Sequence, residues 1–187
     1  MKKIYFVTQN DYKFKKFKKS INSSLFEFIQ LSESTPEIQA ATNAEIASFS
    51  AKWAADKFNK PVICEDVGLY INTFNGFPGP YLSQVEKWLK TDGFLKLTEN
   101  VVDRSAQWEY SVAFCAPKKE PVSFSTFPKG KIAERAQGKG GWYADKVFLP
   151  DNDTRTIAEL LDLGIYKRNK DHYESLVDYL EKNFEFK

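Results

Sequence analysis

Residues 61–81, PVICEDVGLYINTFNGFPGPY, place two adjacent carboxylates, Glu65 and Asp66, between two apolar runs. Two acids inside an otherwise buried strand are costly unless a cation meets them. A divalent metal is the simplest such partner, because hard cations bind carboxylate oxygens. The alternative is one salt-bridged acid and one solvated acid at a strand end. The stretch alone leaves both interpretations open.

The chain before this stretch alternates between strands and helices. Apolar spacing predicts strands over residues 3–8, 25–31 and 61–66, a helix capped by Asn10, and a second helix over residues 43–58. This βαβα order favours an α/β fold in which at least part of the sheet is parallel.

The second half of the chain predicts a different arrangement. The patterns predict a helix over 82–98 broken near 92–93, a β-hairpin over 107–115 and 121–127, a strand near 146–149, and helices over 156–163 and 170–184. We therefore expect a single domain over residues 1–187, in which an antiparallel lobe joins the α/β unit and leaves a cleft.

Composition excludes several classes of protein. The net charge of +2 gives no electrostatic reason to expect a nucleic-acid partner. No run approaches the roughly 20 apolar residues that cross a bilayer, and the N-terminus does not resemble a signal peptide. Cys64 and Cys115 lie far apart in apolar runs, which favours reduced, buried thiols over a disulfide. We expect a soluble, cytoplasmic protein without a membrane partner.

The turn after the first predicted strand has the features of an anion site. A helix N-terminus offers free N–H groups and a favourable dipole to an anion. Thr8, Asn10 and Lys13 would add a hydroxyl, an amide and an ammonium group. An ordinary capped helix with a lysine-coated face is the alternative interpretation.

Five pieces of the chain occur in the order of a known family. They are 8–13 (TQNDYK), 36–39 (PEIQ), 65–69 (EDVGL) with 76–81 (GFPGPY), 141–145 (GWYAD) before 147–150 (VFLP), and 156–160 (TIAEL) followed by Lys167 and His172. In this order and spacing, the chain resembles the inosine triphosphate pyrophosphatase family over nearly its whole length.

The resemblance implies a fold and a reaction. The fold would be an elongated α/β protein with a mixed central sheet flanked by helices and a nucleotide cleft between two lobes. In the reaction, water attacks a non-standard purine nucleoside triphosphate (ITP, dITP or XTP) and gives the monophosphate and pyrophosphate. A homodimer is implied by analogy with the family.

The resemblance also implies roles for residues in the first three pieces. Thr8, Asn10 and Lys13 would bind the polyphosphate. Glu37 and Asp66 would hold Mg²⁺, which screens the phosphates and acidifies a bound water. Asp66 would also be the general base, with Glu65 beside it as the second catalytic carboxylate.

The remaining pieces would meet the base. Trp142 would stack on the base and Asp145 would orient its loop, while Lys167 would reach phosphate or base. His172 and Tyr173 occupy the positions that read the 6-oxo group of the purine. Without the resemblance, Trp142 would be read as core, and Lys167 and His172 as polar surface residues.

Several positions depart from the family pattern. The family arginine after His172 is Tyr173, and a phenol cannot form the forked hydrogen bonds of a guanidinium. Counting back from Asp66, the phosphate-binding lysine becomes Ser50, and Lys52 lies about 200° around the helix from it. Val67 stands where relatives often have a hydroxyl residue.

These changes keep two alternative functions open. One is a homologue that binds nucleotide without efficient hydrolysis. The other is an enzyme that acts on a modified or pyrimidine nucleotide.

Overall fold

A computed structural model describes residues 1–184, which fall into two compact units. The first unit comprises residues 1–66 and 110–126 and the described residues from 170 onward; the second comprises residues 67–109 and 127–169. The strands β3 (Val62–Ile71) and β5 (Ser105–Cys115) each contribute residues to both units.

The first unit contains a mixed sheet. Its other strands are β1 (Lys2–Val7), β2 (Phe26–Leu31) and β6 (Val122–Thr126). β1 pairs in parallel with β2 and with β3, whereas β5 and β6 form an antiparallel pair. The predicted α/β class with a partly parallel sheet is therefore confirmed, and so is the predicted hairpin.

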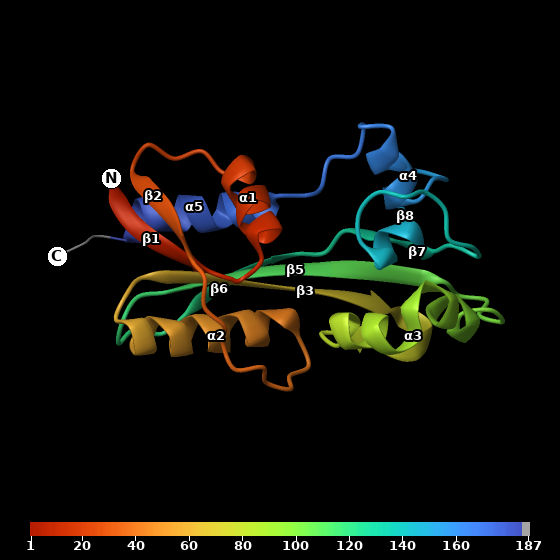
Figure 1. Ribbon diagram of the computed structural model, residues 1–187, viewed down its shortest axis with the longest axis horizontal. Coiled ribbons are helices and arrows are strands. Elements are labelled where there is room, and N and C mark those ends of the chain that lie inside the picture. Colours follow the sequence, from red (N-terminus) through yellow and green to blue (C-terminus); the bar gives the residue numbers. More distant parts are fainter. Residues whose placement is uncertain (185–187) are drawn as a thin grey trace. The chain divides into compact units, whose positions relative to one another are not determined.

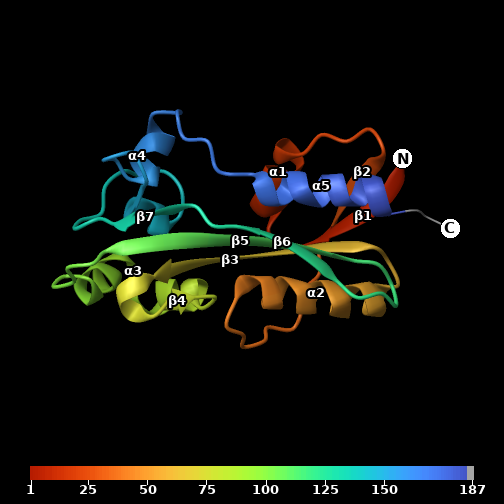
Figure 2. The ribbon, with the colours of Figure 1, turned by 180° about the vertical axis from the view of Figure 1, so that it is seen from behind.

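Helices cover both faces of this sheet. α1 (Asp11–Ser20) and α5 (Asp171–Asn183) lie over one face and α2 (Asn43–Phe58) over the other (Figures 1 and 2). The core between the sheet and these two helices, α1 and α5, is rich in aromatic side chains. In it Phe17 and Tyr173 pack edge to face with their ring centroids 5.3 Å apart.

α2 packs closely because its buried face is built from alanines. Ala47, Ala51, Ala54 and Ala55 are at most 1% exposed and belong to a cluster with strand residues such as Val62. Small side chains let the helix backbone approach the sheet. The bounds of α2 match the helix predicted over 43–58.

The second unit is built on antiparallel pairs. Its elements are η1 (Asn72–Phe74), β4 (Pro78–Gly79), α3 (Leu82–Leu97), β7 (Lys129–Ile132), η2 (Tyr143–Lys146), β8 (Phe148–Pro150) and α4 (Ile157–Asp162). β7 pairs antiparallel with β5 and with β8, and β4 pairs antiparallel with β3.

Several elements differ from the prediction, and three of them have a clear structural reason. β3 continues to Ile71 instead of ending at residue 66, because β4 pairs with its second half at Leu69↔Gly79. α3 is interrupted at Lys90, where φ is 52°, two residues before the predicted break. β7 was not predicted, because its sequence KGKI carries a single apolar side chain.

Gly130 explains why β7 escapes the pattern search. A β-carbon at this position would lie 2.6 Å from the ring of Phe148 and 2.2 Å from the carbonyl oxygen of Leu149. Gly130 and Ile132 point inward while the lysines point outward, so the strand does alternate. Gly130 thus occupies an inward position of a strand, whereas a glycine in a sequence is usually interpreted as a turn residue.

Cys64 and Cys115 are buried free thiols, as predicted. Burial raises the pKa of Cys64 to about 12 and that of Cys115 to about 11. Both thiols are therefore protonated and unreactive at neutral pH. No helix within residues 1–184 combines the length and apolar character that crossing a membrane requires.

Candidate active site

The start of α1 in the first unit brings the predicted phosphate ligands together. Thr8 Oγ1 accepts a hydrogen bond from the Asn10 N–H (3.1 Å), and Asn10 Oδ1 accepts from the Lys13 N–H (3.0 Å). Asn10 is therefore the N-cap of α1, as predicted. The Lys13 ammonium donates to the Glu65 carbonyl oxygen at 2.5 Å, which connects this helix start to the acid pair on β3.

Glu65 and Asp66 are half-buried in the middle of β3 and point to opposite faces of the sheet. Glu65 accepts a hydrogen bond from Tyr173 of α5, whereas Asp66 accepts one from Asn43 of α2. Since α5 and α2 cover opposite faces (Figure 1), the two carboxylates occupy different environments.

Glu65 lies among cationic and phenolic groups. Burial by itself raises the pKa of Glu65, but the ammonium charges of Lys13 and Lys16 and the Tyr173 hydroxyl outweigh burial and hold the pKa below its usual range. Glu65 is therefore ionised at neutral pH. The Tyr173 phenol donates to the Glu65 carboxylate, and burial with this negative charge raises the pKa of the phenol.

Asp66 is held by a residue that the sequence did not reveal. Asn43 Nδ2 donates to Asp66 Oδ2 at 2.5 Å, and Asn43 is fully buried at the first position of α2. The only signal in the sequence is a polar residue directly after the capping residue Thr42. Such a residue normally faces solvent, so the sequence alone would not single it out.

His172 is buried, which contradicts the surface interpretation. Its ring stacks on Tyr110 with centroids 5.8 Å apart and planes 18° apart. Neither ring nitrogen has a hydrogen-bond partner within residues 1–184. Burial lowers the pKa of His172 to about 4. The imidazole is therefore neutral at pH 7 and offers one donor and one acceptor.

The second unit contains its own buried carboxylate, Asp145, in η2. Its Oδ2 accepts from the Trp142 N–H (2.7 Å) and from the Arg168 guanidinium (2.5 Å). Its Oδ1 has no hydrogen-bond partner within the part of the chain that the structure describes. Trp142 is 36% exposed and its indole binds Glu86, so it is not a core residue.

Asp145 thus contacts the backbone of the Trp142 loop, and its second partner, Arg168, was not predicted. Tyr143, the next residue in this loop, is buried and donates to the Leu82 carbonyl oxygen at 3.1 Å. Lys167 is exposed, and Val67 is half-buried in β3.

Ser50, at the position expected to carry a phosphate-binding lysine, is buried. Ser50 is 6% exposed, and its hydroxyl accepts from Thr35 at 3.2 Å. Lys52 pairs with Asp56 at 2.5 Å on the outer face of α2. The ammonium group of Lys52 is thus engaged with a carboxylate one turn along the same helix.

Within residues 1–184, no three His, Cys, Asp or Glu side chains gather in the way that a metal centre built only from protein ligands requires. Mg²⁺ does not require such a centre, because it commonly binds through one or two carboxylates, waters and substrate phosphates. Asp66 offers hard oxygen ligands, and Glu37 lies exposed in the loop that leads into α2. Carboxylate oxygens of this kind are ligands that Mg²⁺ takes.

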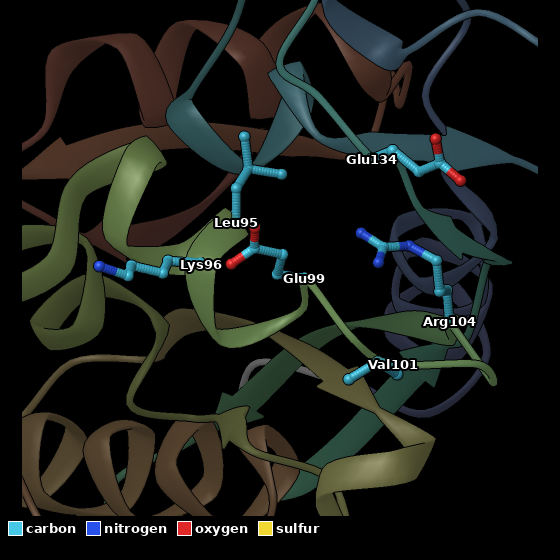
Figure 3. Close-up of a pocket in the computed structure, with 6 residues that line it drawn as sticks. All are labelled: Leu95, Lys96, Glu99, Val101, Arg104 and Glu134. Carbon is cyan, nitrogen blue, oxygen red and sulfur yellow. The ribbon is translucent and has the colours of Figure 1, made fainter.

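A cavity of about 650 Å³ lies in the second unit (Figure 3). Its lining residues are Leu95, Lys96, Glu99, Val101, Arg104 and Glu134. The Arg104 guanidinium donates to the carbonyl oxygens of Thr98, Ile132 and Ala133. Since these bonds tie the end of α3 to β7, the Arg104 side chain has a structural role.

A model described as the Ham1 family matches residues 4–163 of the chain. The chain belongs to the Ham1 family. The resemblance to inosine triphosphate pyrophosphatases is thereby confirmed. The match includes Glu65, Asp66 and Asp145 and ends before His172 and Tyr173. The C-terminal helix of this Ham1 protein therefore lies outside the matched residues.

Known proteins similar to this Ham1 protein cover most of its length. The dITP/XTP pyrophosphatase of Methanosarcina acetivorans is 39% identical over 179 residues, 95% of each chain. That of Methanopyrus kandleri is 36% identical over 158 residues, 84% of each chain. The structure of a HAM1 protein from Coxiella burnetii superposes with a TM-score of 0.83 at 25% identity, covering 97% of this chain and 100% of that one.

Proposed function

We propose that the chain is a nucleoside triphosphate pyrophosphohydrolase that converts non-standard purine nucleotides (ITP, dITP and XTP) to monophosphate and pyrophosphate. One observation carries this proposal: Lys13, at the capped start of α1, donates to the backbone carbonyl oxygen of Glu65 and so connects this helix start to the strand that carries both acids. Relatives whose alignments cover 84–95% of the chain are named dITP/XTP pyrophosphatases.

Thr8, Asn10 and Lys13 form the proposed polyphosphate site. The two side-chain oxygens already fix the start of α1, so its free N–H groups are preorganised. Lys13 adds a point charge that can move from the Glu65 carbonyl oxygen to a phosphate. The site therefore binds an anion without a large rearrangement.

Glu37 and Asp66 are the proposed ligands of Mg²⁺. When bound, the ion screens the phosphate charge and lowers the pKa of a bound water. Asp66 is the proposed general base, which takes the proton of the attacking water. Glu65, fixed on the other face by Tyr173, is the proposed second carboxylate, which keeps Lys13 and Lys16 in place.

Each residue proposed to contact the base offers a group suited to it. Neutral His172 can donate to the 6-oxo group of a purine and accept from a neighbouring N–H. Trp142, half-exposed, offers a stacking surface, and Asp145 holds its loop. Tyr173, Lys167 and Val67 stay in the proposal as substrate contacts.

The assembly and location are also proposals. We propose that residues 1–187 act as a single domain, in the cytoplasm, as a homodimer. Phe77, Tyr81 and Trp88 of the second unit are 41%, 39% and 75% exposed, and exposed aromatic groups of this kind favour association. Sedimentation velocity of the protein beside Trp88→Glu tests this, since the variant should be monomeric at concentrations where the parent is dimeric.

Pyrophosphate release from a panel of nucleoside triphosphates with Mg²⁺, beside an Asp66→Asn control, tests the function. The proposal predicts release from ITP, dITP and XTP that exceeds release from ATP and GTP and that the control loses. No release from any nucleotide, although nucleotide raises the melting temperature, would contradict the enzyme.

The position of Ser50 supports the second candidate, a nucleotide-binding homologue without efficient hydrolysis. A missing phosphate cation lowers transition-state stabilisation by about 2–4 kcal/mol. The third candidate, hydrolysis of a modified or pyrimidine nucleotide, rests on Tyr173 standing in place of the family arginine. A pyrimidine preference in the same panel would select this candidate.

A further inference from the structure

Asn43 is a buried polar residue whose amide meets the carboxylate of Asp66. The amide nitrogen lies 2.5 Å from Asp66 Oδ2, and Asn43 has no exposed surface. We propose that Asn43 is a positioning residue, which holds the Asp66 carboxylate in the orientation that binds a divalent cation. This inference rests on the proposed function, because Asp66 is the proposed ligand of Mg²⁺.

The start of α2 holds Asn43 in a fixed place. Thr42 and Glu45 form a capping box: Thr42 Oγ1 accepts from the Glu45 N–H (3.2 Å), and the Glu45 carboxylate accepts from the Thr42 N–H (3.0 Å). One turn later Ala47 is 1% exposed and packs in the core. The amide is thus presented from a rigid element, which suits precise placement of a ligand.

The strand alone does not orient Asp66. The last torsion of an aspartate side chain is broad and two-fold, so β3 fixes the direction of the side chain but not the plane of its carboxylate. A directional hydrogen bond from Asn43 fixes that plane. Hydrogen-bond partners of metal-binding carboxylates have this effect in general, and their loss typically costs about 10–100-fold in metal affinity or activity.

A neutral donor suits this task better than a cation would. An ammonium or guanidinium group at the same place would cancel the negative charge that attracts the metal ion. The amide of Asn43 orients the carboxylate and adds no charge. Glu65, on the other face, lies among the charges of Lys13 and Lys16 instead.

Asn43→Leu is the informative variant, because leucine has a similar volume and lacks the donor. Thr42→Ala is the matched control: it weakens the same helix start and keeps the amide. Mn²⁺ affinity is measured by electron paramagnetic resonance in the presence of the non-hydrolysable α,β-imido analogue of dITP, beside the melting temperature of each protein. Activity is then measured as kcat and KM over a Mg²⁺ titration.

We expect Asn43→Leu to weaken Mn²⁺ binding about 10–100-fold and to raise the Mg²⁺ concentration for half-maximal activity similarly. Thr42→Ala should lower the melting temperature and leave Mn²⁺ affinity within two-fold of the parent. The inference is overturned if Asn43→Leu binds Mn²⁺ as tightly as the parent, if both variants weaken binding in proportion to lost stability, or if the parent binds no Mn²⁺. If the parent binds Mn²⁺ and Asn43→Leu binds it more weakly, but the parent releases no pyrophosphate, the proposed enzyme is contradicted and the role of Asn43 is supported.

Discussion

The two units treat a buried carboxylate differently. In the second unit Asp145 accepts from a guanidinium, Arg168, so that its charge is neutralised where it lies. In the first unit Asp66 accepts from the neutral amide of Asn43, and Glu65 from the phenol of Tyr173. An ion pair stabilises a loop, whereas a carboxylate oriented by a neutral donor keeps its charge for a cation. We infer from this difference that Asp66 serves the proposed chemistry and that Asp145 serves positioning.

Asp66→Asn gives the largest expected effect on function. Asparagine fills the same space and can accept from Asn43, so the fold should remain while the base and metal ligand are lost. We expect the rate of pyrophosphate release to fall about 100- to 10,000-fold, the usual contribution of a general base. Steady-state kinetics checks the rate, and a melting temperature within a few degrees of the parent checks the fold. A rate within five-fold of the parent would remove Asp66 from the catalytic role.

Arg168→Leu should give the largest effect on stability, because it leaves the buried charge of Asp145 without its cation. Breaking a buried pair typically costs about 3–5 kcal/mol, and we expect the lower end because Arg168 is 22% exposed. Urea unfolding measures the loss. Arg168→Lys keeps the charge, so its loss of unfolding free energy should be less than half of the loss in Arg168→Leu. Equal stability of Arg168→Leu and the parent would show that Asp145 does not depend on this pair.

His172 should make the stability of the protein depend on pH. Burial lowers its pKa from 6.5 to about 4, while Glu65 and Asp171 act to raise it and Lys16 acts with burial. The folded state binds the His172 proton less tightly than the unfolded state. The contribution of the neutral His172 to the unfolding free energy is therefore fully present above pH 6.5. It is lost as the pH falls from 6.5 towards 4, by on the order of 2–3 kcal/mol.

His172→Phe should flatten this dependence, because phenylalanine can stack on Tyr110 and does not titrate. Urea unfolding at pH 7.5, 6, 5 and 4 compares the two proteins. The expected result is a difference in favour of His172→Phe that grows as the pH falls. Parallel curves would show that the imidazole is protonated equally in both states.

The smallest effects on stability are expected from substitutions in the two capping boxes, one in each unit. Thr42 caps α2 and Thr156 caps α4, and each side chain accepts from the N–H three residues later. Replacing a capping threonine by alanine costs about 1 kcal/mol. Thr156→Ala should cost more than Thr42→Ala, because Thr156 is fully buried and its hydroxyl also donates to the Gln137 carbonyl oxygen. Thermal unfolding of both variants checks the order.

Much of the first unit could be predicted because its signals are local. The N-cap at Asn10 and the alanine face of α2 each follow from residues a few positions apart. The acid pair was visible in the same way, as charge inside an apolar run. In the second unit β7 was missed, since its inward glycine is explained by the close approach of Phe148 and Leu149, which are distant in the sequence.

The partners of the site residues could not be predicted, because they come from distant parts of the chain. Asn43 and Asp66 are 23 residues apart, and Tyr173 and Glu65 are 108 apart. No period or motif links such pairs. Alternation along β3 does predict that Glu65 and Asp66 face opposite ways, but which helix meets each of them depends on the topology. Arg168 was missed for the same reason, since its partner Asp145 lies 23 residues away.

The central claim is that the acids of β3 form the centre of a pyrophosphohydrolase. Phosphorus NMR of dITP incubated with the protein and Mg²⁺ tests it most directly, because the spectrum identifies both products. The account predicts resonances of deoxyinosine monophosphate and pyrophosphate that the Asp66→Asn protein does not produce. Orthophosphate as the first product, or the same products at the same rate from Asp66→Asn, would contradict it.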